Sequence, residues 1–136
     1  MNILNDKALK VAQMAMNGLS QRQNIIAQNV ANIDTPGYKA QKVSFESELG
    51  RVISRQKNMN TRAATTHPGH LSSTPSRPNS FFTITARQGM TERADGNNVD
   101  IDIELAEMTE TGLKFEAITN VTSKKLLYLR DIASRR

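Results

Sequence analysis

Apolar residues recur at intervals of three and four along the first third of this chain and again along its last third. The first series runs from about residue 8 to residue 33, is broken by Gln23, and comprises Leu9, Ala12, Met16, Leu19, Ile26, Val30 and Ile33. The second runs from about residue 102 to residue 133, is broken by Gly112 and Thr122, and comprises Leu105, Met108, Phe115, Ile118, Leu126, Leu129 and Ile132. This spacing predicts two long amphipathic helices, each with a coiled-coil-like seam.

A short segment of helix-breaking residues ends the first predicted helix. Thr35 precedes a proline and is pushed towards extended geometry, Pro36 cannot donate to a helix, and Gly37 tolerates the positive φ of a tight turn. The helix therefore ends near Ile33. Gly18, inside the helix, costs about 1 kcal/mol relative to alanine, which indicates that another helix approaches closely there.

The segment between the two helices has mixed character. Val43, Phe45 and Leu49 predict either a short helix or an extended arm, and residues 54–80 are rich in Asn, Thr, Ser, Pro and Arg, which is typical of a loop. Residues 81–86, FFTITA, alternate and predict a short strand or hairpin. The expected fold is mainly α, with two antiparallel terminal helices and an irregular middle. Its parts are 1–53, 54–94 and 95–136.

Composition limits the core that this chain can build. Its 136 residues are 38% hydrophobic and 4% aromatic, with no Trp, so much of the folding free energy should come from partners. Val11, Met14, Ile25 and Val121 also widen the apolar surface beyond a single seam. Apolar surface in excess of what two helices bury on each other is typical of an interaction surface.

Charge is unevenly distributed. The net charge is +5; residues 49–91 contain no Asp or Glu, and residues 95–110 contain no Lys or Arg. Carboxylates at the start of a helix stabilise it by roughly 0.3 to 1 kcal/mol each through the macrodipole, which accounts for the acidic block. A second interpretation is pairing with the basic middle of the same or a neighbouring subunit.

Candidate chemistry is sparse. There is no Cys, and His67 and His70 lie in a proline-containing loop whose neighbours supply no third metal ligand. The seven glycines are scattered and form no phosphate-binding loop. We therefore expect no catalytic residue, cofactor or metal. No run of about twenty apolar residues predicts a membrane span, and the N-terminus does not resemble a cleaved signal peptide.

The residues around the predicted stop carry a family resemblance. They are Ala31, Asn32, Thr35, Pro36, Gly37, Tyr38 and Lys39, followed much later by Asn98, Val99 and Asp100 before the second helix. Helix, ANxxTPGYK and a late Asn-Val-Asp together resemble the rod and hook family of bacterial flagellar axial proteins, most closely its short proximal rod members. The resemblance covers about residues 8–49 and 95–133.

This resemblance implies a non-enzymatic structural subunit of the proximal rod, whose terminal helices join a packed tubular layer in the periplasmic part of the flagellar basal body. Implied partners are other rod proteins, the rod-base adaptor protein and the membrane-anchored ring protein. Export would use the flagellar type III apparatus without a cleaved signal peptide, and Phe45 with Leu49 fits a short export-recognition pattern. The alternative is a soluble adaptor or nucleic-acid-binding protein that uses the basic central segment.

Overall fold

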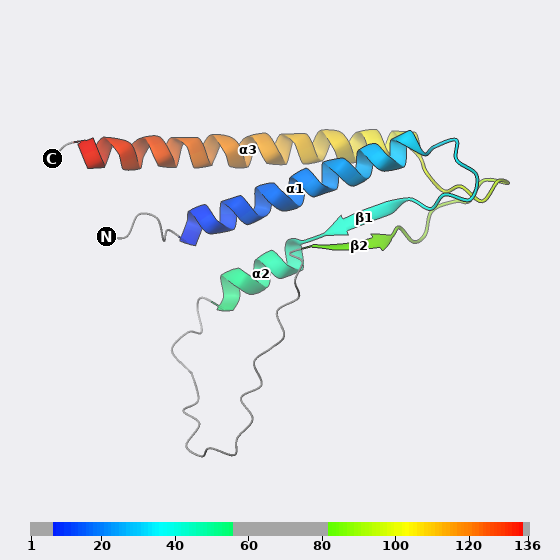
Figure 1. Ribbon diagram of the computed structural model, residues 1–136, viewed down its shortest axis with the longest axis horizontal. Coiled ribbons are helices and arrows are strands. Elements are labelled where there is room, and N and C mark those ends of the chain that lie inside the picture. Colours follow the sequence, from blue (N-terminus) through cyan, green and yellow to red (C-terminus); the bar gives the residue numbers. More distant parts are fainter. Residues whose placement is uncertain (1–6, 56–81, 135–136) are drawn as a thin grey trace, which may run out of the picture.

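The computed structural model describes residues 7–55 and 82–134. It contains three helices, α1 (Lys7–Ala31), α2 (Glu46–Arg55) and α3 (Ile101–Ser134), and two strands, β1 (Gln41–Ser44) and β2 (Thr83–Ala86) (Figure 1). The predicted class, two long terminal helices around a small middle with a β-hairpin, is confirmed. No helix in these two ranges is long and apolar enough to cross a bilayer.

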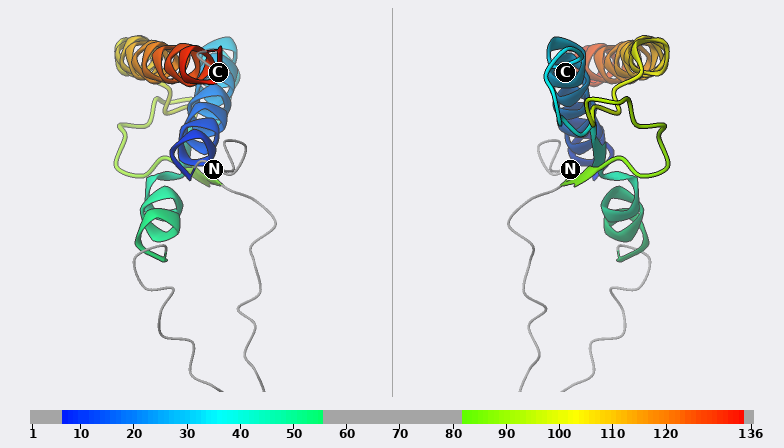
Figure 2. Two further views of the ribbon diagram at one scale, coloured as in Figure 1. Left: turned by 90° about the vertical axis from the view of Figure 1, so that its left-hand side faces the viewer. Right: turned by 90° about the vertical axis from the view of Figure 1, so that its right-hand side faces the viewer.

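The helices α1 and α3 run antiparallel, and side-chain contacts fix their register. Asn29 contacts Glu104 near one end of the pair, and Thr119 contacts Met16 further along. The two helices lie close at the end where α1 finishes and separate towards its beginning at Lys7 (Figures 1 and 2). Helices α1 and α3 therefore form a narrow V, with the first residue of α1 and the last of α3 at the open end.

The middle of the chain returns as a small antiparallel sheet beside α1. Val43 pairs with Ile84, and Arg87, just after β2, donates its N–H to the Ala40 carbonyl at 2.7 Å. Residues 38–52 therefore adopt both of the alternatives left open by the sequence, an extended strand followed by a short helix. The predicted strand at 81–86 is present as Thr83–Ala86.

The apolar core is small and brings together side chains from the three helices and the sheet region. Its buried residues are Leu19, Ile25, Val43 and Phe45, and Leu49, Phe82, Phe115 and Ile118 pack against them. Gly18 lies beneath the Phe45 ring, whose nearest carbon would be 2.5 Å from a Cβ at that position. The expectation of a close helix at Gly18 is thus corrected, because the neighbour is an aromatic ring inserted from the β1–α2 connection.

Helix boundaries differ slightly from the sequence prediction. The first helix ends at Ala31 rather than near Ile33, because Ile33 already lies in the turn that follows. The last helix spans Ile101–Ser134, one residue longer at each end than expected. Strands β1 and β2 come from opposite sides of residue 53, so the hairpin links the expected first and middle parts of the chain.

Candidate functional site

The turn after α1 is closed by backbone hydrogen bonds and by one distant loop. Thr35 donates to the Asn32 carbonyl at 3.1 Å, and Tyr38 donates to the Thr35 carbonyl at 3.2 Å. Gly37 has a φ of 72°, in the left-handed region that favours glycine, and its N–H donates to the Asp95 carbonyl at 2.9 Å. The Thr-Pro-Gly turn is therefore attached to the segment that leads into α3.

Asn97 caps the end of α1 from more than sixty residues away in the sequence. Its side chain is fully buried, and its amide nitrogen lies 2.9–3.0 Å from the carbonyls of Asn32, Ile33 and Thr35. Its Oδ1 accepts the N–H of Val99 at 2.7 Å. These three carbonyls belong to the turn that follows Ala31, so Asn97 holds that turn in place directly after the helix ends.

The next residues of the same segment fix β1 and begin α3. Asn98 Oδ1 accepts the Ala40 N–H at 2.7 Å. Asp100 is the N-cap of α3, with its Oδ1 accepting the N–H of Asp102 at 3.0 Å. Asn-Asn-Val-Asp is thus one connected motif that positions the end of α1, the start of the hairpin and the start of α3.

Asn29, near the end of α1, binds the free edge of β1. Its Nδ2 donates to the Gln41 carbonyl at 2.8 Å and its Oδ1 accepts the Gln41 N–H at 2.9 Å, so its amide replaces a neighbouring strand at that residue. The hydroxyl of Tyr38 also donates to Oδ1 at 3.2 Å, and Nδ2 donates to Glu104 at 3.1 Å. Asn29 therefore joins α1, the turn, β1 and α3.

Glu104 completes this buried polar junction on the side of α3. Its side chain is 0% exposed, and its nearest cation is Arg87 at 3.4 Å; Arg87 also pairs with Glu107 at 2.7 Å. Burial raises the pKa of Glu104, against the hydrogen bond from Asn29 and the charge of Arg87, which lower it. Burial and the Glu104 charge likewise raise the pKa of Tyr38.

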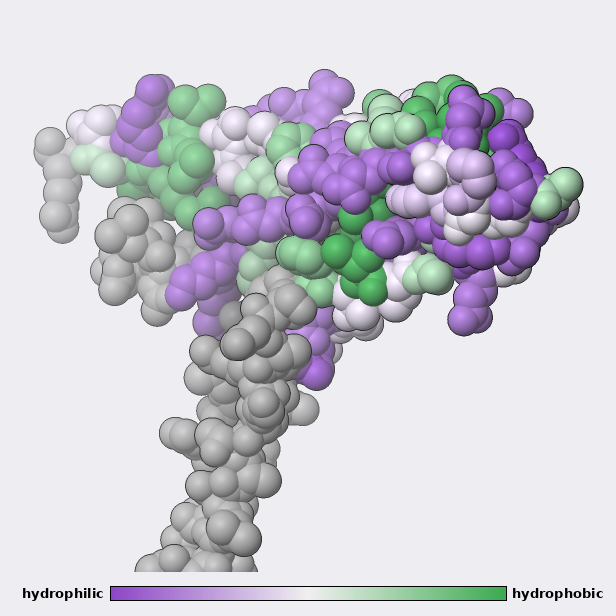
Figure 3. Space-filling model, turned by 45° about the vertical axis from the view of Figure 1, so that its right-hand side comes forward, coloured by the Kyte–Doolittle hydropathy of each residue, from purple (hydrophilic) through white to green (hydrophobic). Residues whose placement is uncertain are grey.

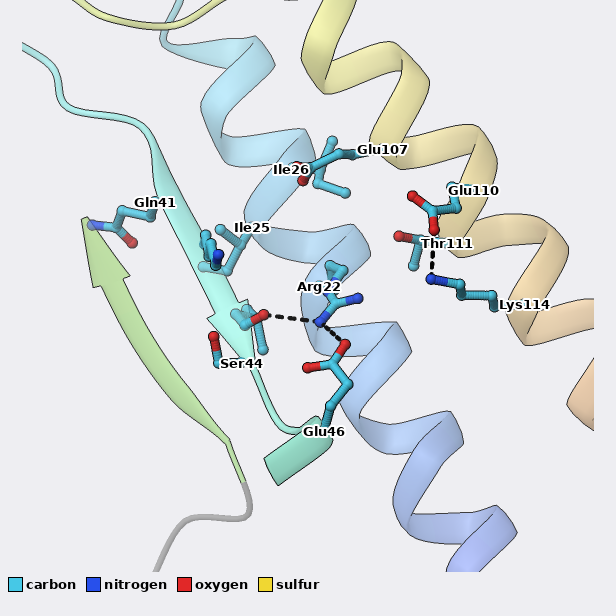
Figure 4. Close-up of a pocket in the computed structure, with 12 residues that line it drawn as sticks. Arg22, Ile25, Ile26, Gln41, Ser44, Glu46, Glu107, Glu110, Thr111 and Lys114 are labelled. Atoms are coloured by element: carbon cyan, nitrogen blue, oxygen red, sulfur yellow. Dashed lines mark hydrogen bonds and ion pairs between the residues drawn. The ribbon is translucent and has the colours of Figure 1, made fainter. Parts of the chain in front are cut away.

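A groove of about 340 Å³ lies beside the junction, between β1 and α3 over the surface of α1 (Figure 4). Arg22 crosses one end of it, donating to the Val43 carbonyl at 3.0 Å and to Glu46. Burial opposes ionisation of Glu46, but the hydrogen bonds from Arg22 and the backbone outweigh it and lower the pKa. Lys114 on α3 pairs with Glu110 at 2.6 Å. Two ion pairs, Arg22–Glu46 and Lys114–Glu110, therefore lie in the lining of the groove.

The predicted turn residues do lie together, but they contribute unequally. Tyr38, Asn32 and Gly37 take part in the hydrogen bonds described above, whereas Ala31 and Pro36 are exposed. Lys39 is outside the junction and pairs with Glu92 at 2.6 Å. Thr35 contributes its backbone and donates its hydroxyl to Asn32 Oδ1 at 3.2 Å.

The sequence did not identify the buried polar partners of that turn. Asn29, Asn97, Glu104 and Arg87 were absent from the predicted site. One pattern could have found the two helical members, namely a polar residue at a position that continues an apolar stripe: Asn29 follows Ile26 by three positions, and Glu104 precedes Met108 by four. Such residues are buried only with hydrogen-bonding partners, so their presence indicates a polar contact between elements.

The predicted helix seam is distributed unevenly over the structure. Leu19 and Ile26 are buried, whereas the half-exposed members are Leu105, at 48%, Leu126, at 50%, and Ile132, at 54%. The remaining members are partly buried, and they are Leu9, Ala12, Met16, Val30, Ile33, Met108, Phe115, Ile118 and Leu129. Glu104 and Thr111 are the buried residues of α3, whereas Leu105 and Leu126 keep about half of their area exposed.

The structure places one of the two remaining candidate sites, the export pattern, but does not describe the other, the histidine pair. Phe45 and Leu49, the possible export pattern, lie in or against the apolar core. His67 and His70 lie outside the described residues. Among residues 7–55 and 82–134, no group of three or more His, Cys, Asp or Glu side chains could hold a metal ion.

The structure therefore has two long terminal helices, with a Thr-Pro-Gly-Tyr turn after the first and an Asn-Asn-Val-Asp segment before the second, as the resemblance to flagellar axial proteins implies. The family model for "Flagella basal body rod protein" matches residues 9–39. Relatives described as "Flagellar basal body rod protein FlgB" match almost the whole chain. The Borrelia hermsii protein is 33% identical over 130 residues, which cover 89% of this chain and 90% of the relative.

Relatives from two other bacteria carry the same description. The Escherichia coli K12 protein is 32% identical over 132 residues, 93% of each chain, and the Bacillus subtilis 168 protein is 33% identical over 111 residues, 82% of this chain and 81% of the relative. The chain belongs to the FlgB family of flagellar basal body rod proteins. It is therefore a structural component of the bacterial flagellar basal body.

Proposed function

We propose that this chain is a structural subunit of the proximal part of the rod and assembles through its terminal helices with copies of itself and with other rod proteins. The observation that carries the proposal is the apolar surface that α3 leaves exposed. Its large apolar side chains with at least half of their area exposed are Leu113, Val121, Leu126, Leu127, Tyr128 and Ile132. A helix with apolar residues on several sides is stable when other chains cover it.

The proposed partners follow from family membership. They are other rod proteins, the rod-base adaptor protein and the membrane-anchored ring protein, with the subunit placed in the periplasmic rod. The charge layout supports contact between unlike surfaces, because the start of α3 is acidic and residues 49–91 carry no acidic side chain.

Export through the flagellar type III apparatus is part of the same proposal. Phe45 is buried in the apolar core and Leu49 is partly buried against it in the folded chain, so an export receptor would bind them before folding. The small core supports export of an unfolded chain, because little buried apolar area opposes unfolding.

The test is complementation in a flagellated bacterium that lacks its own copy of this subunit. The chain should restore swimming and should copurify with isolated basal bodies. Leu126→Glu should be secreted normally but absent from basal bodies, because its half-exposed side chain contributes to contacts between chains and not to the core. His67→Ala combined with His70→Ala should behave like the native chain.

Recovery of the chain on DNA rather than in basal bodies would support the nucleic-acid-binding alternative. Normal rod assembly by Leu126→Glu, together with failure of the double histidine variant, would contradict the structural proposal and point to a site in the loop.

A further inference from the structure

The middle of α1 carries the only asparagine in the sequence that a glycine follows, Asn17 before Gly18. Asn17 is exposed, and Gly18 is buried beneath the Phe45 ring. An asparagine can react with its own backbone, because the nitrogen of the next residue can reach the carbon of the side-chain amide in a flexible chain. Glycine has no Cβ to hinder that approach, so the Asn-Gly sequence is especially open to this reaction.

The reaction exchanges one carbon–nitrogen bond for another. The backbone nitrogen of Gly18 loses its proton and bonds to Cγ of Asn17, the bond from Cγ to the side-chain nitrogen breaks, and ammonia leaves. The product is a cyclic succinimide. Water then opens the ring at one of its carbonyls and gives either aspartate or isoaspartate, in which the main chain runs through the former side chain. Water is the only co-reactant.

The packing of the core requires the glycine that makes this site reactive. A larger residue at position 18 would slow the ring closure, but its Cβ would lie 2.5 Å from the nearest carbon of the Phe45 ring. Phe45 is itself buried in the cluster that contains Leu19 and Ile25, so the ring cannot move aside without opening the core. The reactive pair is therefore a consequence of the contact between α1 and the segment that joins β1 to α2.

Helix α1 in turn blocks the reaction. Gly18 lies in the interior of the helix, where its N–H donates to the carbonyl of Met14, so the nitrogen is not free to attack. A helical side chain also points back towards the N-terminus of its helix, which directs the amide of Asn17 away from the nitrogen of the residue that follows it. Ring closure therefore requires α1 to open at this position.

We propose that Asn17 is a site of spontaneous deamidation that α1 protects. The residue keeps its amide in the folded chain and loses it while the chain is unfolded. This modification concerns the chemistry of the free chain and is independent of the rod function proposed above. The rate follows the equilibrium between closed and open α1, because only the open chain closes the ring. The amount of modified Asn17 therefore records how long a chain has been unfolded.

The two products affect α1 differently. Aspartate at residue 17 leaves the main chain unchanged at an exposed position. Isoaspartate adds a methylene to the main chain, so the helical hydrogen bonds lose their register there and Gly18 no longer lies beneath Phe45. In the part of the chain that the structure describes, the buried apolar cluster is the one around Phe45, whereas apolar residues over both ends of α3 are on the surface (Figure 3). Isoaspartate should therefore prevent the native fold.

Peptide mapping of the full-length chain by mass spectrometry tests the site. The chain is incubated at one pH and temperature, either in buffer, where circular dichroism verifies its helices, or in guanidinium chloride above its unfolding transition. Conversion of Asn17 should be at least about 10-fold faster in the denaturant. Asn24 and Asn120 are also exposed but precede larger residues, so they should keep their amides under both conditions. Asn17→Gln should stay unmodified, because its longer side chain closes a ring far more slowly.

Two further variants connect the reaction with the fold. Phe45→Leu removes the ring above Gly18 and loosens the core, so Asn17 should be converted faster in buffer than it is in the native chain. Chains that carry isoaspartate, separated by chromatography after the incubation, should recover less helix than untreated chain when the denaturant is removed. Asn17→Asp has the same charge and an ordinary main chain, so this matched control should refold completely.

Several results would overturn the proposal. Equal conversion of Asn17 with and without denaturant would show that α1 does not protect it, and an amide that persists in denaturant would show that this is no modification site. Full recovery of helix by the isoaspartate chain, or an equal loss of helix in Asn17→Asp, would contradict the effect assigned to the altered main chain. All of these measurements use the free chain, so they are separate from the tests of swimming and basal-body assembly.

Discussion

At the scale of single residues, buried amides connect distant parts of this chain in addition to the apolar core. Asn29, Asn97 and Asn98 together bind backbone groups of the turn after α1, of β1 and of the segment before α3. A buried amide needs partners in particular directions, so it tolerates few alternative packings. The small apolar core contributes stability, and the amides determine which arrangement is adopted.

The contact between Gly18 and Phe45 gives a prediction at this scale. In an open helix, Gly→Ala stabilises by about 1 kcal/mol, but here the new Cβ would stand 2.5 Å from the ring. We expect Gly18→Ala to destabilise the chain by about 1 to 3 kcal/mol in urea unfolding. In a Phe45→Leu background the same change should be neutral or stabilising. A destabilisation that is unchanged by Phe45→Leu would show that the ring is not the obstacle.

Glu104 gives a prediction for the pH dependence of stability. Because its pKa is raised in the fold, the folded chain binds this proton more tightly than the unfolded chain does. The stabilising contribution is therefore complete below the ordinary glutamate pKa of about 4.3 and is lost as the pH rises through the raised value.

Glu104→Gln should remove this dependence, since Gln can still accept the Asn29 hydrogen bond and Arg87 keeps Glu107. Relative to the variant, the native chain should lose free energy of unfolding as the pH rises above the ordinary glutamate pKa of about 4.3, measured by urea titration at a series of pH values. Glu116→Gln, exposed on the same helix, changes the net charge equally and serves as control. A native chain that gains stability over the variant as pH rises would contradict the assignment.

At the scale of elements, the Thr-Pro-Gly-Tyr turn ends one helix and starts a sheet. Gly37 supplies the positive φ, and the Asn97 amide binds carbonyls of the turn that follows α1. If α1 continued past Ala31, Tyr38 would move away from Asn29 and the edge of β1 would lose its amide partner. The turn and the segment before α3 therefore work as one unit, although sixty residues separate them.

Replacing Pro36 and Gly37 together with alanine should damage this unit. Both new residues are compatible with a helix, and alanine at the φ of Gly37 costs about 1 to 2 kcal/mol. We expect lower thermal stability and lost motility with the secreted level maintained. Gly50→Ala in α2, where a Cβ has nothing within 4 Å, is the matched control and should be neutral or stabilising. Normal swimming by the double variant would contradict the proposed role of this turn.

At the scale of the whole molecule, the chain is an open V with a thin core and long helices. Amphipathic helices depend mainly on tertiary packing, and the end of α3 has little of it within one chain. We expect the helix content of the dilute monomer, measured by circular dichroism, to rise on assembly. Full helicity with a sharp cooperative melt in the dilute monomer would contradict this expectation.

The sequence by itself determined the two long helices, the stop at Pro36 and the strand near residue 84. These depend on local rules, namely the spacing of apolar residues, the missing N–H of proline and the alternation of strand residues. The family could also be inferred from the sequence, because the turn motif and the Asn-Val-Asp segment are each short and contiguous.

The tertiary structure alone decided which side chains meet. Only folding brings Phe45 over Gly18, Asn97 to the end of α1, and Glu104 into a buried position while Leu105 stays exposed. The direction of a stripe on a helix depends on where the neighbouring elements lie, and a difference of one position rotates a residue by about 100°. Apolar spacing predicts that a helix has a buried face, but packing decides which residues form it.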